Sequence, residues 1–321
     1  MYLNCKTYYS FRYGTYATEE LVKAGAERGA SAMALTNINS TCDAWDFVEY
    51  CQQQQIKPIV GVEIRNGDKL CYILIAANNS GFGWINAFLS EHLITEKPFP
   101  ELAKQSFFDN TADGFVIYPL GTKYPDVLFP NERIGVMPSE IFKLYGVDIK
   151  NFKEKFVVRQ PVTFQNKTYF NVHRLLRAID KNVILSKLPT TAQANGDEMF
   201  VPPSKILDAF KFYPFMVTNT YELMNACNIT MEFHVDKNKK TFTASAEDDR
   251  ILLEKLALDG LTFRYKKNKK AKERLHSELK VINDLGFNAY FLITWDLIRY
   301  ARSRGFYYVG RGSGANSIVA Y

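Results

Sequence analysis

A glycine-rich stretch near the end of the sequence has the residue types of a phosphate-binding loop. In YYVGRGSGANSIVAY, a run typical of a strand meets Gly310, Arg311, Gly312 and Ser313 and then turns toward a helix. At such a junction free backbone N–H groups and the helix N-terminus can cradle a phosphate. The stretch lacks the Lys-Ser or Lys-Thr of a Walker loop and the three glycines of a dinucleotide fingerprint. A plain glycine turn capped by Ser313 is the alternative interpretation, and both stay open.

Positive charge is concentrated toward the same end of the chain. The formal net charge is +6, with 40 Lys and Arg against 34 Asp and Glu. Residues 1–236 hold 23 basic against 25 acidic residues, and residues 237–321 hold 17 against 9. The run KKNKKAKER at 266–274 is a solvated face or a contact to a nucleic-acid backbone, where each neutralised phosphate releases counterions.

The cysteines, histidines and clustered aromatics do not indicate a site of their own. No two cysteines form a C-x-x-C pair, so we expect reduced thiols and no structural zinc (Cys5, Cys42, Cys51, Cys71, Cys227). The histidines have no ligand spacing and are expected to pack or to cap helices (His92, His173, His234, His276). Tyr290, Phe291 and Trp295 have helical spacing and are expected in a core.

Strands and helices alternate over the first 120 residues, which predicts an α/β domain. Helices are expected at 19–28, 43–54 and 83–92, and strands at 33–37, 57–64, 70–78 and 113–120. Repeated βα units predict a parallel sheet or barrel with its chemistry at the carboxyl ends of the strands. The pattern weakens over 123–158 and resumes in PVTFQNKTYF and a following helix. From about residue 246 the spacing is helical. No membrane span or signal segment is seen, so we expect a cytoplasmic protein.

Two sets of motifs carry a resemblance to a known family. The stretch RLHSELKVINDLGFNAYFLITWDLIRYARSRGFYYVGRGSGANSIVAY resembles the start of the palm domain in the alpha subunit of bacterial DNA polymerase III, the C-family replicative polymerase. Upstream, YYSFRYGT, AMALTNINS, IKPIVGVEI and ADGFVIYPL resemble that family's N-terminal PHP (polymerase and histidinol phosphatase) domain. The resemblance implies a PHP-type distorted (β/α)7 barrel over 1–238, then a mainly helical N-terminal part of the palm over 239–321.

The resemblance also implies an activity and partners for the parent protein. In this family the Gly-Arg-Gly-Ser loop faces the triphosphate of the incoming nucleotide, and the palm aspartates that hold Mg²⁺ come after it. We therefore expect an N-terminal fragment of a DNA-directed DNA polymerase that holds no cofactor and cannot itself synthesise DNA. The implied partners are DNA, deoxynucleotides, the proofreading exonuclease and other replisome subunits.

At the metal site of the PHP domain, the resemblance implies that the ligands have been replaced. The family's usual His, Asp and Cys positions match residues that ligate a metal poorly or not at all, and the cysteine position falls near Gly121 (Asn4, Lys6, Tyr13, Asn37, Ile38, Lys167, Tyr169). Only Glu63 keeps a ligand side chain. A lysine about 4 Å from a divalent ion would be repelled by roughly twice the ~4 kcal/mol of a like unit pair at an effective dielectric near 20. We expect no bound metal.

The pairing of Lys6 with Glu63 has one alternative, and the polymerase function has two. Either Lys6 replaces the metal's charge and pairs with Glu63, or Lys6 extends to solvent and Glu63 is hydrated. A metal-dependent PHP phosphoesterase or nuclease would require metal ligands that the alignment does not find. A non-catalytic docking module is the remaining alternative.

Overall fold

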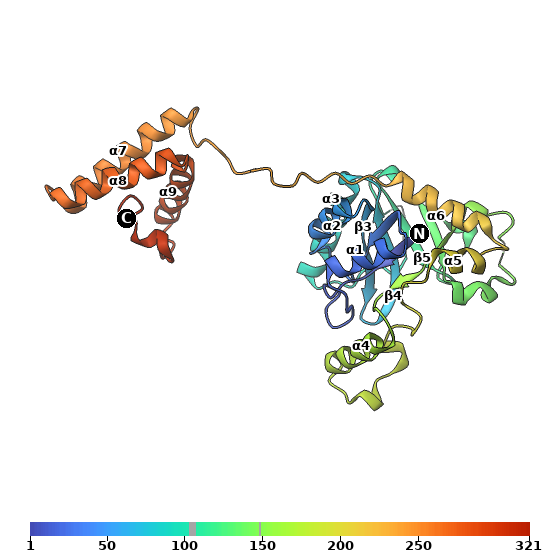
Figure 1. Ribbon diagram of the computed structural model, residues 1–321. Helices are drawn as coiled ribbons and strands as arrows, with labels where there is room; N and C mark the ends of the chain where they lie inside the picture. The colour runs from blue at the N-terminus through green and yellow to red at the C-terminus, as the bar shows by residue number, and fades with distance from the viewer. Residues whose placement is uncertain (103–106, 148) are drawn as a thin grey trace. The chain divides into compact units, whose positions relative to one another are not determined.

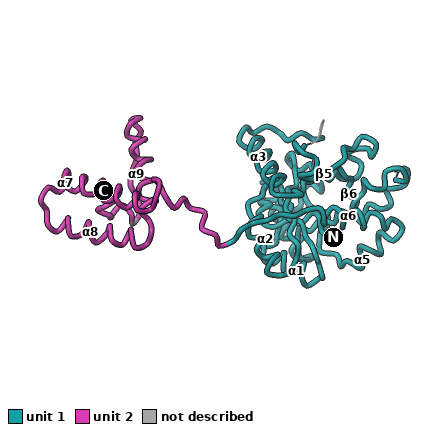
Figure 2. Tube along the Cα trace, turned by 90° about the horizontal axis from the view of Figure 1, so that it is seen from above, with its two compact units in different colours: residues 1–233 teal, residues 234–321 magenta. Residues whose placement is uncertain are grey.

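The chain forms two compact units, at residues 1–233 and 234–321 (Figures 1 and 2). The computed structural model describes residues 1–102, 107–147 and 149–321, without the side chain of Ser313. The boundary expected from the sequence, after residue 238, falls five residues beyond the observed division, within the extended segment that begins the second unit (Figure 1).

The first unit is built on one curled, eight-stranded sheet (Figure 1). The strand order is β7-β6-β5-β4-β3-β2-β1-β8. The described strands are β1 (Tyr2–Cys5), β2 (Ala32–Leu35), β3 (Lys57–Asn66), β4 (Lys69–Ala76), β5 (Gly114–Pro119), β6 (Glu132–Val136), β7 (Phe156–Val158) and β8 (Pro161–Val162). Of these, β4 alone runs antiparallel to its neighbours. The sheet therefore has the nearly parallel, barrel-like curl expected from the sequence, with β7 and β8 as its outer strands.

The antiparallel strand β4 is a difference from the expected succession of parallel βα units. Asn66 and Lys69 face each other across a two-residue turn, so β3 and β4 form a hairpin without an intervening helix. Gly67 has a φ of +61°, which is favourable for glycine and strained for other residues. A Gly-Asp dipeptide between two strand-like runs is a hairpin signal, and the prediction of separate strands at 57–64 and 70–78 overlooked it.

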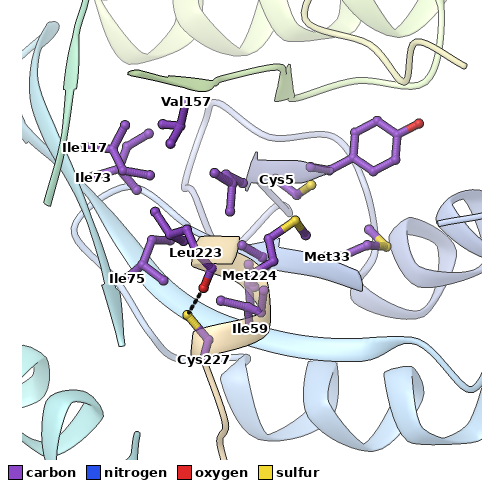
Figure 3. Packing of buried hydrophobic residues seen from close by; sticks show 14 of the residues in the cluster. Cys5, Met33, Ile59, Ile73, Ile75, Ile117, Val157, Leu223, Met224 and Cys227 are labelled. Atoms are coloured by element: carbon purple, nitrogen blue, oxygen red, sulfur yellow. Dashed lines mark hydrogen bonds between the residues drawn. The ribbon is translucent and has the colours of Figure 1, made fainter. Parts of the chain in front are cut away.

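Six α-helices lie in the described part of the first unit. They are α1 (Thr18–Glu27), α2 (Ala44–Gln53), α3 (Asn79–Thr95), α4 (Lys167–Asp180), α5 (Pro203–Ala209) and α6 (Pro214–Ala226). The predicted helices at 19–28, 43–54 and 83–92 are confirmed as α1, α2 and α3. Figure 3 shows Leu223 and Met224 of α6 pointing among strand residues such as Ile59 and Ile75, so α6 closes one face of the apolar core.

The segment PVTFQNKTYF forms less strand than its apolar start suggests. Only Pro161 and Val162 pair with β1. The Asn166 side chain accepts hydrogen bonds from the backbone N–H groups of Thr168 and Tyr169 and thereby caps α4. Residues from Lys167 onward are therefore helical.

The second unit is helical and includes α7 (Ala246–Tyr265), α8 (Lys269–Asp284) and α9 (Asn288–Ser303). Ser245 caps α7 and Asn268 caps α8 through their side chains. Small apolar clusters hold the helices together, with Leu275 and Leu292 fully buried. The core role expected for Tyr290 is wrong, because 67% of its surface is exposed.

The strand-to-helix junction expected before the glycine loop is also absent from the described residues. Residues 306–311 are irregular, and the described part of the second unit contains no strand with which this segment could pair. The loop is followed by a short 3₁₀ helix, η7 (Ser313–Asn316). Across the residues that the structure describes, no helix combines the length and apolar character needed to cross a membrane.

Candidate functional site

A polar cavity of about 180 Å³ opens at the carboxyl-end edge of the sheet in the first unit. Lys6, Met137 and Arg159 directly follow β1, β6 and β7 and line it. This is the edge at which the α/β pattern predicts chemistry. The remaining lining residues come from β1, β8, the β3–β4 hairpin, the segment after β1 and the 191–198 segment (Asn4, Tyr13, Glu63, Arg65, Asp68, Leu70, Pro161, Thr191, Gln193, Asn195, Glu198).

At the base of the cavity, Glu63 and Lys6 form a buried ion pair. Lys6 Nζ lies 2.8 Å from Glu63 Oε2, and both side chains are almost completely buried. The Asn4 side-chain amide donates to the same oxygen at 2.7 Å, and Lys6 Nζ donates to Asn4 Oδ1 at 3.3 Å. The predicted pairing of Lys6 with Glu63 is confirmed, and the solvent-exposed alternative is wrong.

Arg65 is a second cation on the same carboxylate, and the sequence analysis missed it. Its Nε lies 2.6 Å from Glu63 Oε1. Its guanidinium carbon lies 4.5 Å from the centre of the Tyr13 ring, and Nη2 donates to the Tyr13 hydroxyl at 3.1 Å. Residues two apart on a strand point to the same face, so the spacing from Glu63 was a usable signal.

The two cations fix the charge of Glu63. Burial by itself raises the pKa of a carboxyl group, but the charges of Arg65 and Lys6 outweigh it and lower the pKa of Glu63 to about 2. The same carboxylate raises the pKa of the Arg65 guanidinium against the opposing effect of burial. Glu63 is therefore ionised and electrically satisfied by protein groups throughout the neutral range.

Asn37 and Ile38 do not line the cavity, although the Asn37 carbonyl oxygen accepts from the Glu63 backbone N–H and Ile38 bridges to Glu63. Asn37 Oδ1 accepts from the Thr7 backbone and the Ser10 hydroxyl, both at 2.8 Å. Its amide donates to Asp43 Oδ1 at 2.6 Å. Ile38 packs beside Tyr13 in a small apolar cluster. These two positions help to hold the β1 and β2 loops together.

Lys167 and Tyr169 are not brought to the cavity either. Both lie in the first turn of α4, and Tyr169 is 40% exposed. Asn195 and Glu198, from the loop before α5, line the cavity instead. Gly121 follows β5 with a φ of +87° and is also outside the lining. Sequence spacing could not place the loop at 191–198, because no regular element fixes its register.

His173 is a packing residue, as expected. It is fully buried, its Nδ1 lies 2.7 Å from the Tyr13 carbonyl oxygen, and its Nε2 accepts from the Ala194 backbone N–H at 2.8 Å. Nδ1 is therefore the protonated nitrogen. Burial lowers the pKa of His173 to about 4. The histidine joins the Tyr13 loop to the 191–198 loop, both of which line the cavity.

The residues at the cavity do not fit a divalent metal. Glu63 is the one carboxylate at a ligand position, and both of its oxygens are paired with cations. Within residues 1–102, 107–147 and 149–321, no group of three or more His, Cys, Asp or Glu side chains is placed to hold an ion. A divalent cation would have to displace Lys6 and Arg65 against their own charge.

The Gly-Arg-Gly-Ser loop lies in the second unit. Gly310, Arg311 and Gly312 face solvent, and Gly312 has a φ of +85°. Just beyond it, Glu278 Oε2 of α8 accepts hydrogen bonds from the Ser317 hydroxyl and the Ile318 N–H, both at 2.8 Å. The backbone after the loop is thus anchored to α8, while Gly310, Arg311 and Gly312 remain accessible.

Comparison with known proteins agrees with this architecture. The PHP domain family matches residues 3–117, and the bacterial DNA polymerase III alpha NTPase domain family matches residues 251–321. The error-prone DNA polymerase of Symbiobacterium thermophilum is 23% identical over 100% of this chain and 34% of its own length. The DNA polymerase III alpha subunit of Escherichia coli is 26% identical over 100% of this chain and 32% of its length.

The matches indicate a class of domains first and particular relatives second. The chain resembles a PHP domain followed by part of a bacterial DNA polymerase III alpha NTPase domain. Along its whole length it is similar to bacterial DNA polymerases, among them DNA polymerase III alpha subunits, and it spans about a third of the length of the curated relatives it matches. One solved structure, described as a metal-dependent phosphoesterase from Bifidobacterium adolescentis, covers 65% of this chain at 10% identity, and its TM-score of 0.28 is too low to carry an argument.

Proposed function

We propose that these residues are the N-terminal part of a replicative DNA polymerase that adds deoxynucleotides to a primer on a DNA template. The observation that carries the proposal is the match along the whole chain to DNA polymerase III alpha subunits. In that protein we place Mg²⁺ on palm residues outside this sequence, with DNA and deoxynucleotides as substrates, in the cytoplasm. Gly310, Arg311, Gly312 and Ser313 would bind the triphosphate of the incoming nucleotide.

Within this protein, the first unit acts as a scaffold without metal-dependent hydrolysis. The buried cluster of Lys6, Arg65 and Glu63 supports this role, because two protein cations neutralise the carboxylate that a metal would need. A surface for the proofreading exonuclease or another replisome subunit is the corresponding binding role.

Two measurements on the purified chain test the proposal. The first is metal content after exposure to manganese and zinc, together with hydrolysis of p-nitrophenyl phosphate. We expect substoichiometric metal and no turnover. Stoichiometric metal, with turnover that Glu63→Ala abolishes, would establish the phosphoesterase alternative instead.

The second measurement is primer extension by the whole protein that contains these residues, with the 321-residue chain alone as the control. We expect extension by the whole protein only. Replacing Arg311 with Ala in the whole protein should raise the KM for deoxynucleotides. An unchanged KM would remove the glycine loop from the nucleotide site, and no extension by the whole protein would refute the polymerase proposal.

A further inference from the structure

Helix α4 carries a row of apolar side chains on its exposed side, here called the α4 stripe. The opposite side of the helix is buried at His173, Arg177 and Ala178. Figure 1 shows α4 at the periphery of the first unit. Single exposed apolar side chains are ordinary, but a row of them along one helix marks an interaction surface. The stripe consists of five residues between 37% and 58% exposed, with the partly buried Leu176 among them (Tyr169, Val172, Leu175, Ile179, Val183).

The spacing of the stripe is that of helices that pack against each other. Val172 and Ile179 are seven residues apart, and Leu175 lies between them. Side chains three and four residues apart share one face of a helix. An apolar repeat of seven residues forms the seam between two paired helices. The stripe therefore has the pattern of a surface that another helix covers.

The stripe also reads nearly the same from both of its ends. From Tyr169 to Val183, successive apolar residues are three, three, one, three and four positions apart, and in reverse they are four, three, one, three and three apart. A two-fold symmetric pair needs such a surface, because the same patch must be complementary to itself. This near symmetry favours a second copy of the chain as the covering partner.

The charge of the stripe agrees with a second copy. None of the exposed α4 residues from Tyr169 to Ile179 is charged. Asp180 comes directly after them, and its carboxylate pairs with Arg12 at 3.3 Å and with Arg177 at 2.9 Å. A second copy therefore meets no uncompensated like charge along the stripe, whereas an acidic or a basic partner finds no opposite charge there to recognise.

We propose that α4 is a self-association surface, through which two copies of this chain pair with their α4 helices antiparallel. In this arrangement Val172 of one copy contacts the partner's Ile179, and Leu175 lies near the two-fold axis. The antiparallel orientation also places the helix dipoles favourably. This inference does not rest on the proposed polymerase function.

The size of the stripe predicts a weak dimer. With 14 residues, α4 is about 21 Å long, and a helix is about 10 Å across. A contact along one such helix is smaller than the ~800 Å² per partner of a standard interface. Ile184 and Leu185, which are also exposed, extend it beyond the helix. We therefore expect dissociation at low micromolar concentration and dimers at high micromolar concentration.

The first test is sedimentation velocity of the full chain from low to high micromolar concentration. We expect a reversible monomer–dimer equilibrium. Ile179→Lys and Leu175→Lys each place like charges at the seam, so each should raise the Kd of the dimer by about tenfold or more. Both side chains are more than half exposed, and circular dichroism verifies that each variant is folded. The matched control is Ile94→Lys, which changes an 82% exposed residue of α3 and should dimerise as the original chain does.

The second test is disulfide cross-linking, which reports the orientation of the helices. It uses a Cys42→Ser background, because Cys42 is the exposed cysteine and the other four are buried. With oxidised glutathione as the oxidant, Leu175→Cys should cross-link two copies near the axis. Val183→Cys should not, because in an antiparallel pair its two copies lie well beyond the roughly 7 Å between Cα atoms that a disulfide can span.

Three outcomes would overturn the proposal. One is a monomer at every concentration, which would leave the stripe to a different partner. Another is a dimer that Ile179→Lys and Leu175→Lys weaken no more than Ile94→Lys does, which would place the interface elsewhere. The third is cross-linking through Val183→Cys, or none through Leu175→Cys, which would exclude the antiparallel pair.

Discussion

The buried carboxylate of Glu63 is the residue on which the cavity depends most. It accepts hydrogen bonds from Lys6, Asn4 and Arg65, and the side chains of Glu63, Lys6 and Asn4 are almost completely buried. Removing one member of a buried ionic cluster destabilises the fold by more than the intact cluster stabilises it. The reason is that the remaining buried charges lose their compensation.

We expect Glu63→Gln to lower the free energy of unfolding by about 3–5 kcal/mol, since it leaves two buried cations without a countercharge. Urea denaturation followed by circular dichroism measures the change. The matched control is Glu101→Gln, which removes an exposed carboxylate paired with Lys69 and should cost at most about 1 kcal/mol. Equal effects of the two substitutions would show that the Glu63 cluster is not buried in solution.

His173 contributes a pH dependence of stability below pH 6.5. Its folded pKa of about 4 lies below the ordinary value of 6.5, so the unfolded chain takes up this proton first as the pH falls. The stabilisation is therefore complete above pH 6.5 and is lost between pH 6.5 and 4, by roughly 3 kcal/mol for the full shift. Glu63, with a folded pKa of about 2 against 4.5, continues the loss below pH 4.5.

Burial also lowers the pKa of the Met1 α-amino group from 8.0 to about 6, so the unfolded chain takes up that proton first between pH 8 and 6. The free energy of unfolding is therefore expected to decrease steadily from pH 8 toward pH 4.5, with the Met1 amine acting in the upper part of this range and His173 in the lower part. Urea titrations at half-unit steps of pH measure the profile. In His173→Gln the decrease between pH 6.5 and 4.5 should be much smaller, although the variant starts from a lower stability. The same slope in both proteins would assign the acid sensitivity to another group.

Part of the site could be predicted from individual residues. Asn4, Lys6 and Glu63 occupy positions that the family resemblance marks, so their contact followed from the alignment and from the need to compensate a buried charge. Arg65 and Arg159 lie outside the positions at which that family places ligands. Arg159 reaches the cavity only because β7 ends beside β6, which the weak pattern over 123–158 did not indicate.

At the scale of elements, helix α3 approaches the backbone of the segment before β5 closely at one glycine. An added Cβ at Gly81 would lie 1.8 Å from the Asp113 backbone oxygen, whereas Gly83 on the same helix has open space. Asn78 caps the helix through the Gly81 N–H, which brings this turn down onto that segment. The start of α3 is thus set by a cap and by one close approach.

We expect Gly81→Ala to destabilise the protein by about 1–3 kcal/mol, because two backbone segments must separate. Gly83→Ala is the matched control and should be neutral or stabilise by up to about 1 kcal/mol through its better helix propensity. Thermal unfolding of both variants measures the difference. If Gly81→Ala were as stable as Gly83→Ala, α3 would not pack on the Asp113 backbone as described.

The elements show where sequence periodicity succeeds and where tertiary context decides. The amphipathic helices α1 and α2 and the strands with continuous apolar runs were predicted close to their observed bounds. The β3–β4 hairpin is indicated only by its turn dipeptide, and the start of α4 after β8 is indicated only by the Asn166 cap. Both signals are short and lie inside apolar segments. Residues 306–311 have strand composition, but a strand also needs a partner, which periodicity along one segment cannot supply.

At the scale of the whole molecule, the two units differ in how much apolar surface they bury. The first has one large continuous core around the sheet. The second has two small clusters, and several of its large apolar side chains, among them Phe263, Leu297 and Phe306, are mostly exposed. A small core provides little net stability, since conformational entropy offsets most of the burial.

We therefore expect two unfolding transitions, with the second unit unfolding at the lower urea concentration. Tryptophan fluorescence can separate them, because Trp45 and Trp84 lie in the first unit and Trp295 lies in α9 of the second. In the double variant Trp45→Phe and Trp84→Phe, fluorescence reports the second unit alone, and in Trp295→Phe it reports the first. A single shared midpoint in both variants would mean that the units unfold as one cooperative body. Separate midpoints, with that of Trp295 lower, would show that the large core folds without support from the helical unit.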